Sequence, residues 1–198
     1  MTTTSAISWY GKLPSAGDFL QRRFPDALQR QWSHWFQVGL MNWQKEEERA
    51  ADRQFGNAPI WNFVVPPMLG GQQVQMGCLL PGRDSVGRQY PLCALLAINP
   101  LEWSARQLAQ SGDWYQQLGR TLLHAMRNGY SAEQLDQSLL LIPTPQPVVE
   151  ESRSEILDVI GYEGDAAPTL GWRQAAECFD PLRQTSFWWT NRSDGYPL

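Results

Sequence analysis

Apolar residues along the chain follow two different spacings, and each spacing predicts a different kind of element. From Pro25 onward they recur every three or four residues, which is the period of an amphipathic helix with one buried face. Pro25 stands at the start, where the missing N–H of a proline costs no helical hydrogen bond. The pattern predicts one long helix with an apolar stripe made of Leu28, Trp32, Trp35, Phe36, Leu40 and Trp43.

Short apolar, β-branched segments bounded by proline or glycine predict strands. These segments are residues 7–10, 60–65, 74–80, 90–98, 156–160 and 185–190. The turn-rich stretch 81–88 joins two of them and predicts a hairpin. A chain of 198 residues fits one domain, and the connection 143–147 is too short to separate two cores, so we expect one domain over residues 1–198.

The helical pattern returns after the hairpin. Residues 101–127 predict a helix with a break near Ser111, and Gly129 supplies the left-handed residue that ends many helices. Ser131 and Gln134 have the spacing of a capping box at the start of the next helix. A last short helix is predicted at 171–178. Strands and helices interspersed in this way indicate a layered α/β domain, in which helices cover a sheet.

Composition narrows the function classes. The chain has 198 residues, a net charge of −4 and no basic run, so it lacks the electrostatic footprint of a nucleic-acid-binding protein. Three cysteines form no CxxC pair, which is typical of a reducing compartment. No apolar run is long enough to span a membrane, and the first residues lack the features of a signal peptide. We therefore expect a cytoplasmic protein without membrane insertion.

Few residues carry the chemistry of an enzyme. The chain has two histidines, His34 and His124, and neither has the Cys or His neighbours that a zinc site requires. Cys78 and Cys93 lie in apolar strands, where a thiol is usually an inert small hydrophobe. A Cys–His pair that meets only in space stays open. We expect no enzyme activity, no metal and no cofactor.

The first charged turn covers residues 11–23. Asp18 has two interpretations here: it caps a short helix and pairs with Arg22 at i+4, or it belongs to a preformed binding loop. In the second interpretation the loop displays Lys12, Arg22 and Arg23 to an acidic partner. All four residues are candidates for partner binding.

The second charged turn is the hairpin loop 81–88. In one interpretation Asp84 bonds local backbone N–H groups and the arginines are solvated. In the other, Arg83 and Arg88 bind a carboxylate or phosphate of a partner through their guanidinium groups. The sequence leaves both open, and Arg83, Asp84 and Arg88 are candidates for partner binding. Ten tryptophans exceed what one core of this size hides, so some are expected on the surface as anchors for a partner. Trp188 and Trp189 in the last predicted strand are the candidates.

These segments also carry a family resemblance. In order along the chain they read WYGKLPSAGDF at 9–19, APIWNF at 58–63, LPGRDSVGRQYPL at 80–92 and SFWWT at 186–190. Together they resemble the TagF (ImpM-like) family of type VI secretion accessory proteins. The resemblance implies a single-domain three-layer α/β/α sandwich, for which we expect a central mixed sheet. Residues 102–177 match no motif of the family.

The resemblance also implies a function. Members of this family act as post-translational repressors of type VI secretion in Gram-negative bacteria, through the forkhead-associated (FHA) domain protein of that system. We therefore expect a binding protein whose partner is the FHA-domain component, with other secretion-system components as further partners. Two alternatives remain: a structural assembly factor of the secretion apparatus, and a hydrolase or phosphatase-like enzyme. A deep pocket that joins the charged turns to a histidine would favour the enzyme.

Overall fold

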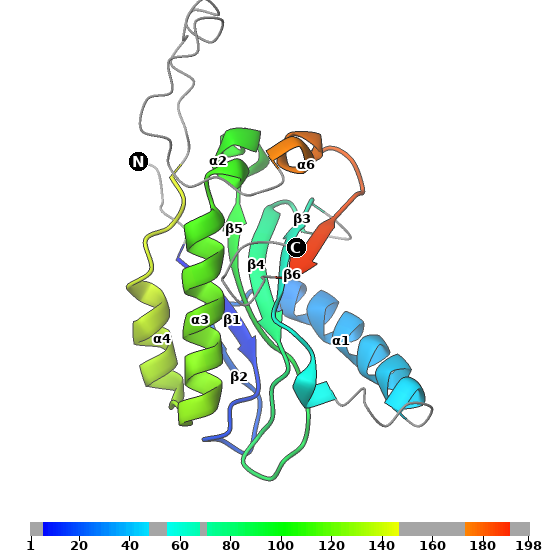
Figure 1. Ribbon diagram of the computed structural model, residues 1–198, viewed down its shortest axis with the longest axis vertical. Coiled ribbons are helices and arrows are strands. Elements are labelled where there is room, and N and C mark those ends of the chain that lie inside the picture. The colour runs from blue at the N-terminus through cyan, green and yellow to red at the C-terminus, as the bar shows by residue number, and fades with distance from the viewer. Residues whose placement is uncertain (1–5, 48–54, 68–70, 147–172, 191–198) are drawn as a thin grey trace, which may run out of the picture.

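The fold is a three-layer α/β/α sandwich around one antiparallel sheet (Figure 1). The computed structural model describes residues 6–47, 55–67, 71–146 and 173–190. Within them the strand order is β2-β1-β5-β4-β3-β6. The strands are β1 (Ser8–Gly11), β2 (Leu20–Arg22), β3 (Trp61–Val65), β4 (Val74–Leu80), β5 (Leu92–Ile98) and β6 (Phe187–Thr190).

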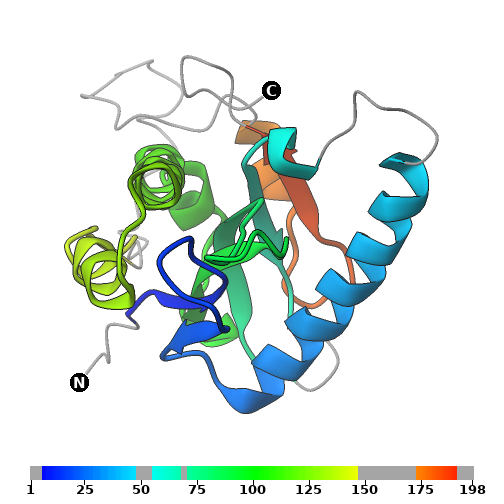
Figure 2. The ribbon, with the colours of Figure 1, turned by 90° about the horizontal axis from the view of Figure 1, so that it is seen from below.

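One face of the sheet is covered by α1 (Asp26–Glu47), which Figure 2 shows lying across it. The helix buries Trp32 and Phe36 against Phe63 of β3 and Leu95 of β5. The indole N–H of Trp32 donates to the Oε1 of Gln75 at 2.8 Å, so that both buried polar groups are satisfied. The apolar stripe predicted from the sequence is thus the inner face of this helix.

The opposite face carries the larger core (Figure 1). The helices there are α2 (Ala105–Ala109), α3 (Gly112–Asn128), α4 (Ala132–Leu140) and α6 (Arg173–Cys178). The 3-10 helix η1 (Phe55–Asn57) precedes β3, and η2 (Pro100–Glu102) follows β5. Strands β4 and β5 lie at the centre of the sheet and are buried along almost their whole length. Cover on both faces explains why these two strands are almost entirely apolar rather than alternating, with the hydrogen-bonded Gln75 as the polar residue of β4.

Most of the elements predicted from local patterns are confirmed. The break near Ser111 separates α2 from α3, and Gly129 ends α3 with a φ of 61°. Ser131 and Gln134 form the capping box of α4, with both of its hydrogen bonds present. The hairpin across 81–88 joins β4 to β5. The strand predicted at 156–160 lies outside the described residues.

Two expectations are wrong. The central sheet is not mixed, because every pairing between its described strands is antiparallel. No short helix follows Asp18: Leu20–Arg22 is strand β2, which pairs with β1 in an antiparallel hairpin. Asp18 is exposed and caps no helix. The strand directions depend on pairing between distant segments, and β2 depends on its pairing with β1; local helix signals contain neither.

Candidate partner-binding surface

The two charged turns lie against each other at one end of the sheet and are joined by a buried carboxylate. Asp84 has a fully buried side chain and accepts hydrogen bonds at both oxygens. Its Oδ2 receives the Nζ of Lys12 at 2.8 Å and the Nε of Arg88 at 2.7 Å. Its Oδ1 receives the backbone N–H groups of Val86 at 3.1 Å and Arg88 at 2.9 Å. Two residues predicted as partner contacts, Lys12 and Asp84, thus hold the turns together.

The electrostatics of this contact favour an ionised carboxylate. Burial alone would raise the pKa of Asp84, but the hydrogen bonds from Lys12, Arg88 and Val86 outweigh it and hold that pKa far below its ordinary value. Two cations and two backbone donors satisfy the charge, as a buried ion requires. The side chain of Lys12 is itself 8% exposed. Neither residue is available to a partner.

The backbones of the two turns are also in close contact. A Cβ atom on Gly82 would stand 2.4 Å from the carbonyl oxygen of Tyr90 and 3.0 Å from that of Lys12, so that only glycine fits. The backbone N–H of Ser85 donates to the carbonyl of Ala16 at 2.9 Å. Arg88 donates from Nη2 to the carbonyl of Gly17 at 2.6 Å. Residues 11–19 and 81–91 therefore form one rigid unit, called the turn platform below.

The turn platform presents apolar and charged side chains to solvent. Phe19 is 50% exposed, although its ring packs against Tyr90 at 4.7 Å between centroids and lies under the Nζ of Lys12 at 4.9 Å. Val86 is 71% exposed, and Asp18 is also exposed. Because the backbone of the platform and the ring of Phe19 are held in place, the surface is suited to preformed contact, in which little freedom is lost on binding.

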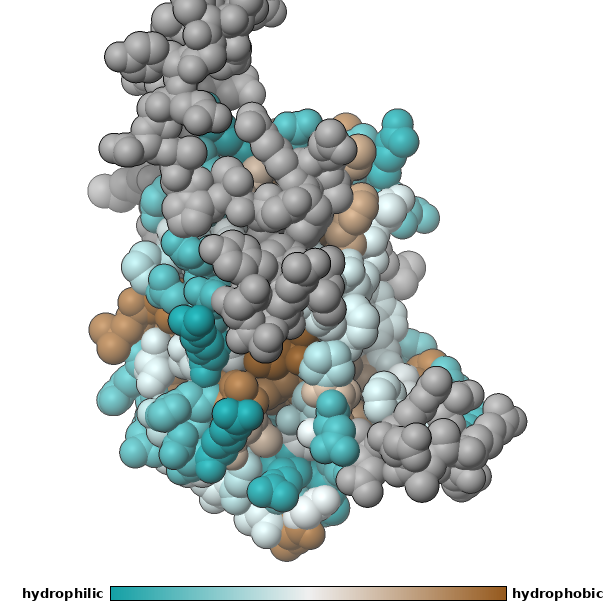
Figure 3. Space-filling view, viewed as in Figure 1, coloured by the Kyte–Doolittle hydropathy of each residue, from teal (hydrophilic) through white to brown (hydrophobic). Residues whose placement is uncertain are grey.

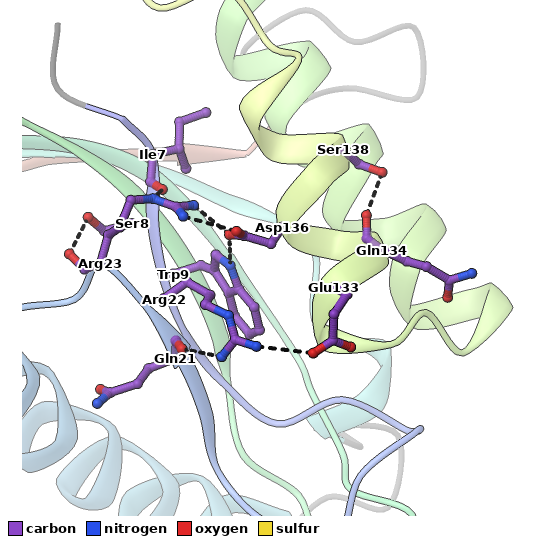
Figure 4. A network of polar contacts seen from close by, with 10 residues as sticks. All are labelled: Ile7, Ser8, Trp9, Gln21, Arg22, Arg23, Glu133, Gln134, Asp136 and Ser138. Atoms are coloured by element: carbon purple, nitrogen blue, oxygen red, sulfur yellow. Dashed lines mark hydrogen bonds and ion pairs between the residues drawn. The ribbon is translucent and has the colours of Figure 1, made fainter.

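Arg22 and Arg23 lie away from the turn platform, in a network that ties β2 to α4 (Figure 4). Arg23 donates from Nη1 to Asp136 at 3.0 Å and from Nε to the carbonyl of Ile7 at 3.0 Å. The indole N–H of Trp9 reaches the same carboxylate at 2.8 Å. These hydrogen bonds, with that of Arg23 foremost, lower the pKa of Asp136.

Arg22 belongs to the same network and donates to Glu133 at 3.2 Å, rather than pairing with Asp18. Arg23 also holds a left-handed backbone, with a φ of 55°. Both arginines, predicted as partner contacts, are therefore engaged within the chain and fix the β1–β2 hairpin to α4.

The two tryptophans of β6 face opposite sides of the sheet. Trp189 is 6% exposed and packs edge-on against Tyr115 at 4.7 Å, so it is a core residue and no anchor for a partner. Trp188 is 39% exposed and lies over Phe63 at 5.1 Å. Alternation along a strand explains the difference. Of this predicted pair, Trp188 alone stays a candidate.

The two cysteines of the central strands have no sign of reactivity. Cys78 and Cys93 are buried, and burial raises the pKa of each thiol well above its ordinary value, which disfavours the reactive thiolate. Among the described residues no three His, Cys, Asp or Glu side chains lie together as a metal ion would need. In the same part of the chain no helix is long and apolar enough to cross a membrane.

A second group of exposed basic residues was not predicted from the sequence. Arg120, His124 and Arg127 follow one another at four- and three-residue spacing on the outer side of α3. Arg83, which the sequence did indicate, lines a hollow together with Arg127. The spacing of these basic residues on one side of a helix was visible in the sequence. It was overlooked because these residues lie in the region that matched no motif of the family.

Comparison with known proteins supports the family resemblance. A family model described as "TagF N-terminal domain, Type VI secretion system-associated" matches residues 8–142, from β1 to the end of α4. The chain is also similar to the crystal structure of PA0076 from Pseudomonas aeruginosa PAO1, with a TM-score of 0.65 and 23% identity over 93% of this chain and 81% of that one. At this identity the likeness concerns the fold. No curated protein sequence matches significantly. The chain therefore belongs to the family of type VI secretion system-associated TagF N-terminal domains.

Proposed function

We propose that this protein is a cytoplasmic regulator that restrains type VI secretion by binding the FHA-domain component of that system, without catalytic turnover. The observation that carries the proposal is the turn platform, which is built from the segments most typical of the family. Its interior is fixed by the Lys12–Asp84 ion pair and by glycine contacts, and its outer side presents Phe19 and Val86. Such a surface is suited to recognising another folded protein.

A binding titration tests the site. Val86 is 71% exposed, and only its backbone N–H bonds to Asp84, so Val86→Asp should leave the thermal midpoint nearly unchanged. At a contact with the purified FHA-domain protein it should weaken affinity at least about tenfold, since a charge would be buried there. Leu101→Asp is the matched control, because Leu101 is 93% exposed and lies in η2, beside α2 at the far end of the sheet (Figure 1). If both variants bind the FHA-domain protein as tightly as the unaltered chain does, the turn platform is not part of the interface.

Deletion in the native bacterium separates a repressor from an assembly factor. Loss of a repressor raises type VI secretion, whereas loss of an assembly factor abolishes it. Complementation with the Val86→Asp variant should fail to restore repression, although the protein accumulates normally. Abolished secretion in the deletion strain would overturn the proposal in favour of the structural role.

A further inference from the structure

A hollow opens beside the lower end of α3, on the face shown in Figure 3. Its volume is about 560 Å³. The apolar part of its lining is Ile60, Leu80, Leu123 and Met126, with Phe55 of η1 at one side. Figure 3 shows apolar side chains low in the centre of this face, bordered by hydrophilic ones. We call this hollow the bowl.

Among the residues that the structure describes, the charged side chains that line the bowl are both arginines. They are Arg83 and Arg127, and Arg120 with His124 continues the same side along α3. No described Asp or Glu lines the bowl or the neighbouring hollow on α3. We call Arg83, Arg120 and Arg127 the arginine strip.

Nearby carboxylates do not neutralise the arginine strip, because other cations already engage them. Asp84 is bound by Lys12 and Arg88, and Asp136 is bound by Arg23. Glu133 pairs with Arg22. Within the described part of the chain, the guanidinium groups of the strip form no ion pair. A protein with a net charge of −4 thus keeps a local positive surface around a hollow whose lining is partly apolar.

We propose that the bowl and the arginine strip form a docking surface for an acidic segment of a partner protein, with an apolar side chain in the bowl and carboxylates on the arginines. The inference goes beyond the proposed function, since it assigns a partner chemistry to the bowl. The bowl adjoins the turn platform and shares Arg83 with it, but Leu123, Met126 and Arg127 of α3 lie outside the platform. Arginine forks match carboxylates in geometry as well as charge. The apolar floor adds area that a free anion would not use, which favours a peptide segment over a small ion.

The test uses labelled peptides and the full chain. The probe is a short fluorescein-labelled peptide of glutamates with a leucine at every fourth position. Two comparison peptides replace the glutamates by lysines or the leucines by serines. The glutamate–leucine peptide should bind best, and its affinity should fall steeply with added salt, because exposed charges are screened. Amide signals of Leu123, Met126 and Arg83 should shift in the ¹⁵N-labelled protein.

Matched variants locate the surface. Joint replacement of Arg83, Arg120 and Arg127 by glutamine should weaken peptide binding at least about tenfold, because three charge contacts are lost. The control replaces Arg30, Lys45 and Arg106 by glutamine, which removes the same charge from exposed positions elsewhere. Its affinity should stay within about twofold of the unaltered chain, since distant exposed charges are largely screened.

Four results would overturn the inference: no binding of the glutamate–leucine peptide, equal binding of the lysine peptide, equal effects of the two triple variants, or signal shifts confined to α1. Self-association of the protein that the strip variant alone abolishes would assign the surface to a second copy of the chain instead. Binding of the FHA-domain protein is a separate measurement, and its failure would leave the peptide result standing.

Discussion

Replacement of Trp32 tests whether the inner face of α1 is the core that the structure describes. Trp32 is 1% exposed, and its ring contacts Phe63 at 4.8 Å and Phe36 at 5.4 Å between centroids. Its indole N–H also satisfies the buried Oε1 of Gln75. Trp32→Ala therefore removes a large apolar side chain and leaves an amide oxygen without its donor.

The magnitude follows from these two losses. A buried aromatic side chain removes about 150–250 Å² from water, which at about 25 cal/mol/Å² is about 4–6 kcal/mol as an upper estimate. Truncations of this size in cores cost about 3–5 kcal/mol, and the orphaned Oε1 of Gln75 adds about 1–3 kcal/mol. We expect Trp32→Ala to cost about 5 kcal/mol, a large share of the stability of a domain this size. Trp32→Phe should cost about 2 kcal/mol, because most of the ring stays.

Trp35 is the comparison on the same helix. The sequence pattern places both tryptophans on the apolar stripe, yet Trp35 is only partly buried, at the edge of this core. Trp35→Ala should cost about 1–2 kcal/mol, because less area is lost. Urea unfolding, monitored by far-UV circular dichroism, measures all three variants. The same dependence of the free energy of unfolding on urea concentration is used for each of them. Equal costs for the two alanine variants, or an unchanged midpoint for Trp32→Phe, would refute this account of the core.

Three further predictions concern the turn platform, α1 and the thiols. Gly82→Ala should lower the free energy of unfolding by about 1–3 kcal/mol or more, since its Cβ would stand 2.4 Å from a backbone oxygen. Gly39→Ala should raise the free energy of unfolding by about 0.5–1 kcal/mol, because Gly39 lies in α1 with open space around it. The urea midpoint of each variant checks these two values. Because the folded pKa of Asp84 lies below its unfolded value near 4, its contribution to stability is present above that pH and is lost as the pH falls further. The Asp84→Asn variant should therefore be less stable than the unaltered chain at neutral pH, and its thermal midpoint should fall less as the pH is lowered. Midpoints that fall in parallel for the two proteins would contradict this. Of the three cysteines, Cys178 should react with a thiol reagent in the native state and the two buried ones only after unfolding.

Local signals were sufficient for the helices and the central hairpin. Periodicity located α1, and side-chain chemistry located the α4 capping box at Ser131 and the left-handed stop at Gly129. These features depend on residues within a few positions of one another, so that the sequence alone contains them. The family resemblance then supplied the three-layer architecture.

Contacts between distant segments were not predictable in the same way. Asp18 and Arg22 have the spacing of a helical pair, but Arg22 meets Glu133, which is 111 residues away. The identity of the buried partner of Lys12, 72 residues further on, likewise requires the fold. Charged residues that looked alike in sequence thus divide into those used inside the molecule and those left on its surface, such as Arg83 and Arg127.

Hydrogen–deuterium exchange of the protein alone and bound to the purified FHA-domain component tests the central claim most directly. We expect a stable complex in which the backbone amides of residues 12–19 and 82–88 exchange more slowly than in the free protein. Protection of α1 alone, or no complex formation at micromolar concentrations, would contradict it.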